Sequence, residues 1–247
     1  MKQIASKKTG GFSLIELIIS LFAVSLLMTL LMQQYLLSKR QYTKMRTLLE
    51  QNLELQLVTD LISNSLRSAG FTPCASVSSL QSIDRRNGKT QLVAVGLGKE
   101  KGLQINKMDD HFATVDQQLS PSQLLIKGDI HYETKQAVLI ADCYHAEVHE
   151  VLKARKTKSG IVLTLNNSLA FNYIAPIYLG EWIEEEFFVK KNQQNGSSLF
   201  YKNKHTDVVS SLIHSLSIHF DGKTHVEVSI GLEKMPNLVI KTEVRGG

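Results

Sequence analysis

Glu16 is the ionisable residue that the sequence sets most clearly apart. It lies near the start of an apolar run from Phe12 to Met32, and no charged residue follows from Leu17 through Ser38. An ionised carboxylate inside a bilayer costs about 2.5–3.5 kcal/mol on insertion scales. Glu16 therefore either stays solvated near the headgroup boundary or meets a cation in an assembly. Cleavage before Phe12 would supply that cation, as a new amine within one helical turn of the carboxylate.

Two histidines four residues apart lie together with acidic residues in one short segment. On a strand, His145, Glu147 and His149 would share a face, an arrangement that can hold a metal ion. The segment lacks the HExxH pattern of zinc proteases. We therefore predict that these histidines are solvated at the surface and that they bind no metal.

Three consecutive carboxylates, Glu184-Glu185-Glu186, suggest acid–base chemistry only at first sight. Adjacent residues on a strand point to opposite faces, so we expect an edge strand or an exposed strand instead. The glycine-rich residues 96–102 match neither phosphate-loop spacing and are expected to form a mobile turn. The sequence thus predicts a protein that is not an enzyme and that needs no cofactor.

One basic cluster, residues 153–158, has the charge to contact a DNA backbone. It has no interleaved aromatic residue, and it ends at the turn Ser159-Gly160. We therefore predict a solvated hairpin tip and no nucleic-acid ligand. The alternative is a DNA receptor that acts through four cations, Lys153, Arg155, Lys156 and Lys158.

The charge of the whole chain gives little further support to nucleic-acid binding. The 247 residues carry a formal net charge of +5, but Lys2, Lys7 and Lys8 supply three of these units, within eleven residues that contain no acid. Without them, 25 of the 28 basic residues remain against 23 acidic ones, a formal charge of +2. With 43% hydrophobic and 21% charged residues, the composition excludes a disordered chain.

The element that would position Glu16 is one long helix. Neither glycine nor proline occurs from Phe12 to Ala69, which predicts a helix over residues 12–69. Its first part, about 12–37, is long enough to span a bilayer and exceeds the apolar core of a cleavable signal peptide. The second part is amphipathic and needs a packing partner. Its apolar stripe comprises a row of residues four apart, Met45, Leu49, Leu53, Leu57 and Leu61, and the flanking Leu48, Val58, Ile62 and Leu66.

The remaining residues, 70–247, are rich in strand patterns. Apolar and polar residues alternate over 212–220 and 226–230, and Asp221-Gly222 between them is typical of a hairpin turn. The expected fold class is therefore α+β, with a long N-terminal helix packed on a mainly antiparallel, β-rich globular head. Strands are expected over residues 91–95, 123–132, 136–141, 147–154, 160–165, 182–190, 198–202, 212–220, 225–231 and 237–244.

The residues around Glu16 resemble a known motif. Gly10-Gly11 and Phe12-Ser13-Leu14-Ile15-Glu16-Leu17, behind a short basic leader, are similar to the type IV prepilin signature. The resemblance implies a type IV pilin-like fold, a leader of residues 1–11 cut off between Gly11 and Phe12 by a prepilin peptidase, and N-methylation of Phe12. It also implies that Glu16 pairs with the Phe12 amine of its own or an adjacent subunit and sets register during pilus assembly.

Looser similarities extend into the head. Residues 66–71, 142–148 and 198–202 resemble parts of the W-type minor pilins. The resemblance implies a role in type IV pilus assembly, in a priming or tip complex, and so in adhesion, twitching motility or DNA uptake. A J-type pseudopilin of a type II secretion system is the alternative within the same superfamily.

The same resemblance implies where the chain acts and with what. It would be a single-pass protein of the inner membrane with its head in the periplasm, and later part of a pilus on the cell surface. Its partners would be the prepilin peptidase, other minor pilins and the major pilin, the pilins being contacted through the N-terminal helix. A tip adhesin is a further candidate partner.

For a head outside the cytoplasm, the two cysteines suggest one disulfide, Cys74–Cys143. It would tie the end of the long helix to the first sheet. Two unpaired buried thiols are the alternative. A catalytic cysteine is less favoured, because no histidine or acidic partner is implied by the spacing.

Overall fold

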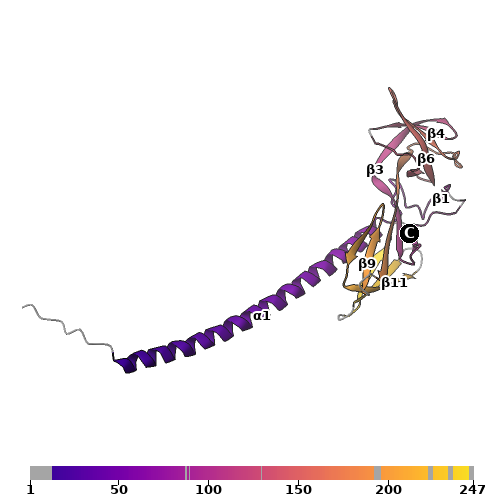
Figure 1. Cartoon of the computed structure of the whole chain (residues 1–247). Helices are drawn as coiled ribbons and strands as arrows, with labels where there is room; N and C mark the ends of the chain where they lie inside the picture. The colour runs from indigo at the N-terminus through magenta and orange to yellow at the C-terminus, as the bar shows by residue number, and fades with distance from the viewer. Residues whose placement is uncertain are drawn as a thin grey trace, which may run out of the picture. The chain divides into compact units, whose positions relative to one another are not determined.

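The computed structural model describes residues 13–86, 88, 90–128, 130–191, 196–221, 225–232 and 236–244. Within these residues it contains one helix and thirteen strands (Figure 1). The long apolar N-terminal helix and the mainly antiparallel, β-rich head confirm the expected α+β class. The chain divides into two compact units between Leu53 and Glu54.

The helix α1 spans Leu14–Arg67. Its N-terminal part is long and apolar enough to cross a membrane. Just beyond its end, Gly70 has a left-handed backbone with φ of 70°, and a Cβ there would lie 2.5 Å from the hydroxyl oxygen of Ser76. Only glycine tolerates both conditions, so it ends the helix where the chain turns into the head.

The face of α1 that packs in the head is the flank of the expected apolar stripe and not its central row. Val58, Ile62 and Leu66 are buried, whereas Leu57 in the expected row is 63% exposed. Successive helical residues are turned by about 100°, so the buried stripe lies one residue further along the chain. The strands of the head therefore cover a narrow stripe of α1 and leave part of its apolar surface exposed.

The strands are numbered in chain order. They are β1 (Gln81–Asp84), β2 (Val95–Leu97), β3 (Leu103–Ser120), β4 (Gln123–Lys127), β5 (Ala137–Ala141), β6 (His145–Thr157), β7 (Gly160–Leu165), β8 (Tyr178–Lys191), β9 (Ser197–Lys202), β10 (Thr206–Ser210), β11 (Ile213–Asp221), β12 (His225–Leu232) and β13 (Leu238–Glu243).

Six of these strands form a closed barrel. β3 pairs with β4, β4 with β7, β7 with β6, β6 with β5, β5 with β8, and β8 pairs back with β3, always antiparallel. An apolar cluster that includes Ile126, Ile140, Leu163 and Leu179 packs within this part of the head. A closed barrel has no free edge strand, because every strand is paired on both sides.

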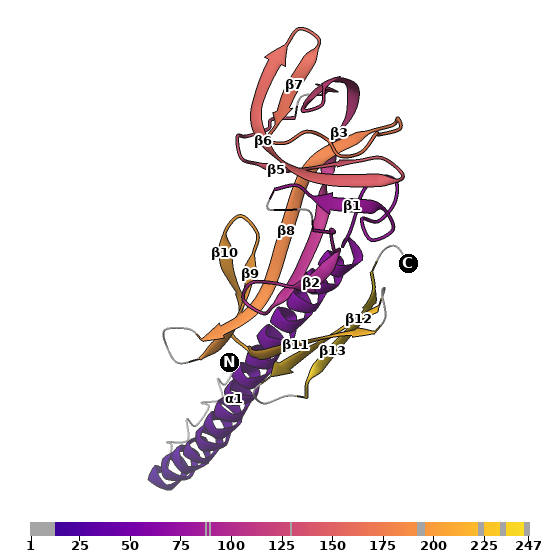
Figure 2. The same cartoon turned by 90° about the vertical axis from the view of Figure 1, so that its right-hand side faces the viewer.

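The other part of the head is built around the N-terminal part of β3 and the C-terminal part of β8. These continue to pair with each other, with β2 beside β3 and β9–β10 beside β8. A separate sheet has the order β11–β12–β13. Figure 2 shows β5, β6 and β7 at one end of the head, β9 to β13 at the other, and β3 and β8 running between them. One core cluster joins Ile62 and Leu66 of α1 to Ile105, Phe187 and Val228.

Several strand predictions need correction. Three strands, β1, β3 and β10, were not expected. The second half of β3 is polar and pairs with β4. The pairing of β3 with β8 shifts register between Met108 and Phe112. The segment expected at 91–95 is irregular until β2 begins at Val95, and the one expected at 123–132 ends at Lys127. β11 and β12 pair up to Asp221↔His225, on either side of the expected turn, but Gly222 lies outside the described residues.

Of the residues expected to form a mobile turn, 96–102, the first two belong to β2 and residues 98–102 connect β2 to β3. The N–H of Gly98 donates to the carbonyl of Gly102 at 2.9 Å, and the N–H of Glu100 donates to Glu186 Oε1 at 2.8 Å. The first bond closes the turn, and the second fixes it against β8.

Candidate functional sites

The start of α1 holds the residue that the sequence singled out. Glu16 is exposed in the first turn of the helix, and its Oε2 accepts the backbone N–H of Ser13 at 3.1 Å. This bond is half of a capping box, and a carboxylate is also favoured there by the helix dipole. The spacing Ser-x-x-Glu, from Ser13 to Glu16, is a sequence signal for this cap. Gly11 and Phe12 lie outside the described residues.

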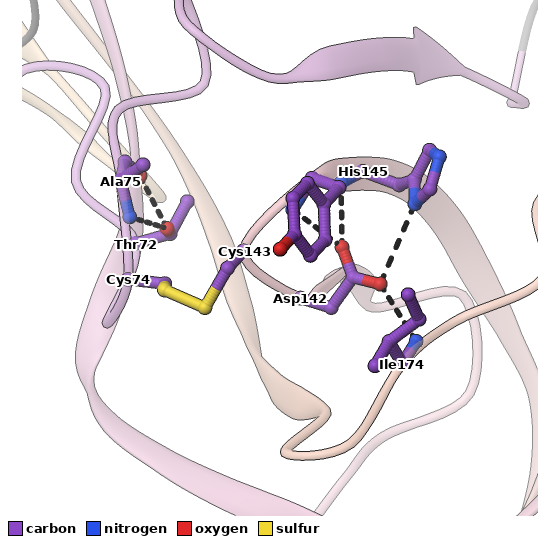
Figure 3. Close-up of a disulfide and its surroundings, with 8 residues drawn as sticks. Thr72, Cys74, Ala75, Asp142, Cys143, His145 and Ile174 are labelled. Carbon is purple, nitrogen blue, oxygen red and sulfur yellow. Dashed lines mark hydrogen bonds and ion pairs between the residues drawn. A yellow bond between two sulfur atoms is a disulfide. The ribbon is translucent and has the colours of Figure 1, made fainter.

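The disulfide predicted for the head is present. Cys74, in the segment after α1, is joined to Cys143 in the β5–β6 turn, with the two Cα atoms 5.2 Å apart (Figure 3). Both residues are exposed, and neither sulfur is free to act as a nucleophile or metal ligand. The bond therefore connects the end of the long helix covalently to the barrel.

Asp142 lies beside this disulfide and is fully buried, which sequence reasoning missed (Figure 3). Its Oδ1 accepts the N–H groups of Tyr144 and His145 at 2.7 and 2.6 Å, and its Oδ2 accepts that of Ile174 at 2.8 Å. Burial alone would raise the pKa of Asp142, but these N–H groups outweigh burial and hold it below its ordinary value. An ionised Asp142 thus ties the β5–β6 turn to the segment before β8.

Glu147 and His149 form a second buried site on β6, where a single residue separates them. Glu147 Oε2 lies 3.0 Å from His149 Nε2, and the carboxylate also accepts the N–H groups of Ala170 and Phe171 at 2.8 and 2.9 Å. Burial would raise the pKa of Glu147, but His149 and the two N–H groups lower it. The prediction of solvated histidines is wrong for His149, which is fully buried in the head.

An aromatic group lies over these acids. The ring of His145 stacks on Phe171 with centroids 4.7 Å apart, and Tyr173 meets His145 edge-on at 6.2 Å. Burial, and then the charge of Glu147, raise the pKa of Tyr173. Within the residues that the structure describes, no three His, Cys, Asp or Glu side chains converge as metal ligands. The arrangement therefore holds the segment between β7 and β8 in place.

The three consecutive carboxylates lie on β8 and pair with β3 on one side, whereas on the other side the pairing with β5 stops at Glu181 and that with β9 begins at Glu186. Glu185 and Glu186 are nevertheless buried. Glu184 is more exposed and pairs with Arg86 Nη2 at 2.6 Å, while the same nitrogen contacts Asp84 at 2.8 Å. Burial would lower the pKa of Arg86, but the two acids raise it. The prediction of an exposed strand is therefore wrong for Glu185 and Glu186, which are buried, whereas Glu184 is exposed.

A buried ion pair joins three elements near the end of α1. Lys107 Nζ on β3 lies 3.0 Å from Glu185 Oε1 on β8 and donates to Ser68 Oγ at 3.1 Å. Removing either partner would leave a charge in a low-dielectric site. This pair serves the packing of α1 on the head.

The basic cluster occupies the β6–β7 hairpin, as predicted. Thr157 pairs with Gly160 at its tip, and Lys153, Arg155 and Lys158 are exposed. The hairpin carries no described aromatic side chain that could stack on a base. The hairpin therefore offers positive charge for a DNA backbone but no aromatic side chains for contacts with the bases.

Comparison with models of known protein families, with curated proteins and with solved structures finds no match. The buried acids, the ion pairs and the disulfide each have a structural role in the head. Evidence for function therefore comes from the N-terminal motif, and from the surfaces that the head leaves open.

Proposed function

We propose that this chain is a minor subunit of a type IV pilus, of the W type. The observation that carries the proposal is the motif Gly11-Phe12 with Glu16 four residues after Phe12, at the start of a charge-free apolar helix. The β-rich head and its disulfide support the proposal, since both suit a protein exported to an oxidising compartment.

In this proposal the first part of α1 has two successive environments. It anchors the precursor in the inner membrane, and after cleavage before Phe12 its apolar face packs against the helices of neighbouring pilins. Glu16 then forms an ion pair with the amine of Phe12, which fixes axial register. The head selects the partners, which are other minor pilins in a priming or tip complex.

Cleavage is tested first. We expect Gly11→Ala to leave the full-length precursor in the membrane, because the peptidase must accommodate this residue beside the scissile bond. Mass spectrometry of the purified chain measures the N-terminus, and Gly10→Ala serves as the neighbouring control. A Gly11→Ala chain that still begins at methylated Phe12 would contradict the assignment.

The role of Glu16 is tested by separating its charge from its helix cap. Glu16→Gln keeps an acceptor for the Ser13 N–H but removes the charge, whereas Glu16→Ala removes both. We expect both variants to be processed and both to be poorly incorporated into pili, as measured by immunoblotting of sheared filaments. Normal incorporation of the Gln variant would show that only the cap matters and would refute the ion pair.

The exposed cations of the β6–β7 hairpin favour a second candidate function, a DNA receptor. Such a receptor would bind duplex DNA in a strongly salt-dependent way. Mobility shifts at low and physiological salt would compare the wild type with an Ala variant of Lys153, Arg155, Lys156 and Lys158. Four exposed lysines elsewhere, Lys99, Lys190, Lys191 and Lys241, provide the charge-matched control. Equal binding by both variants, or no binding at low salt, would exclude the hairpin as the receptor site.

A further inference from the structure

A cleft of about 560 Å³ opens beside β8 in the head. Its walls are the turn before β5, at residues 133–136, and the β9–β10 turn with Asn203 and Lys204. Its third side is β8, through Glu181, Trp182 and Glu184. We call this site the β8 cleft.

The pairing along one side of β8 is interrupted at this cleft. β5 pairs with β8 as far as Val138↔Glu181, and β9 begins to pair at Lys202↔Glu186. From Trp182 to Glu185, β8 therefore has β3 on one side and, among the described residues, no strand on the other. Because strand residues alternate in direction, two of these four residues turn both N–H and C=O toward the unpaired side.

The walls of the β8 cleft are polar, and several of their charges are already paired. Lys204 Nζ lies 2.8 Å from Glu181 Oε1, and Glu184 is bound by Arg86 at 2.6 Å. The indole N–H of Trp182 donates to Glu184 at 3.3 Å. Such walls present donors and acceptors in fixed positions, which suits a hydrogen-bonding ligand of low net charge and disfavours an apolar one.

We propose that the β8 cleft binds a short extended peptide segment of a partner protein, which adds as a strand to the free edge at Trp182–Glu185. The segment has polar side chains where it faces the cleft walls, and it runs antiparallel to β8, in line with β5 and β9. This binding mode is independent of the pilus assignment, because it depends only on the edge of β8 and on the cleft.

The match between a peptide and this edge is one of repeat and length. Four residues of β8 span ~13 Å at about 3.3 Å per residue. A peptide backbone presents donors and acceptors with the same repeat, so it can satisfy each free group of the edge in turn. The turns at both ends of the cleft restrict the paired part to about four residues.

The test uses the full chain in detergent micelles and a phage-displayed library of random decapeptides. Peptides enriched on the wild type are synthesised, and their affinity is measured by calorimetry. We expect N-methylation of every second amide in the middle of the peptide to weaken binding about tenfold or more. Only a few backbone hydrogen bonds join the peptide to β8, so the loss of each one matters. We also expect bound peptide to slow amide hydrogen exchange within residues 182–185.

A cleft-filling variant localises the site. Thr134 is exposed on the wall of the cleft, and Thr134→Trp is expected to abolish peptide binding without lowering the unfolding temperature. Thr114→Trp, at an exposed position of β3 outside the cleft, is the matched control and should bind as the wild type does. The proposal is overturned if no peptide is enriched, if N-methylation has no effect, or if exchange slows elsewhere. Selective binding of an oligosaccharide, displaced by Thr134→Trp, would also overturn it in favour of a glycan site.

Discussion

Asp142 illustrates, at the scale of single residues, how a buried carboxylate can hold two separate segments together. It accepts N–H groups from the β5–β6 turn and from the segment before β8, while Glu147 on β6 accepts the N–H groups of Ala170 and Phe171 in the segment between β7 and β8. Each acts only as an anion, since protonation replaces an acceptor by a donor that faces other donors. The stability of this part of the head should therefore decrease at acidic pH.

The first prediction concerns pH. The pKa values of Asp142 and Glu147 are lowered in the folded chain from ordinary values of 3.8 and 4.5. Their contribution to stability is thus complete above about pH 4.5 and is lost as the pH falls through the lower, folded values. We expect the unfolding temperature to fall steeply below about pH 4.5, with a smaller slope for Asp142→Asn.

The same variant has a measurable effect at neutral pH. Asp142→Asn should lower the free energy of unfolding by about 2–3 kcal/mol, since it removes the charge and one acceptor oxygen from a buried side chain that accepts three N–H groups. Asp116→Asn removes a carboxylate that forms an exposed pair with Lys127 at 2.6 Å and should change stability by less than about 0.5 kcal/mol. Equal losses for both variants, measured by urea unfolding, would contradict the anchoring role of Asp142.

At the scale of elements, α1 serves two purposes along one continuous helix. Its first part has the apolar length for a membrane, and its last turns supply Val58, Ile62 and Leu66 to the core of the head. Leu57 remains exposed beside this buried stripe. The two sides of the same turn should therefore respond very differently to truncation.

The second prediction compares these two sides. Ile62→Ala should lower the free energy of unfolding by about 2–5 kcal/mol, because it leaves a cavity in a packed core. Leu57→Ala should change it by less than about 0.5 kcal/mol, because its side chain has little packing to lose. Urea unfolding of both variants provides the measurement. Equal effects would mean that the packing stripe is wrongly placed.

How far the sequence predicts these elements depends on whether their signals are local. The extent of α1 follows from the absence of glycine and proline, and β7 and β12 follow from alternating residues. The second half of β3 is polar, and its pairing with β8 is known only once both strands are placed. The burial of His149 depends on tertiary packing of the head rather than on a local pattern. The cap formed by Glu16 was local and could have been predicted.

At the scale of the whole molecule, the head combines a closed barrel with a more open part that includes the last turns of α1. β3 and β8 belong to both, so the two parts share strands as well as a chain. The compact unit that contains the head begins at Glu54, within α1. The last turns of the helix are thus part of the folded head.

The third prediction concerns where the head can be cut. A fragment of residues 54–247 should be soluble and fold cooperatively, because it retains Val58, Ile62 and Leu66. A fragment of residues 70–247 lacks all three and should aggregate or unfold at a much lower temperature. Circular dichroism during heating tests both. Equal unfolding temperatures would show that the helix is dispensable for the head.

The bond between Cys74 and Cys143 also determines how the chain yields to a pulling force. A load applied between α1 and the last strand bypasses the segment between the two cysteines, whose sequence separation is 69, because the covalent bond carries it across. This segment corresponds to ~240 Å of extended chain at about 3.5 Å per residue. Single-molecule stretching should show an unfolding length that is shorter by this amount under oxidising conditions than after reduction. The disulfide would thus limit how far the chain can lengthen under tension, because the segment that it closes cannot extend while the bond is intact.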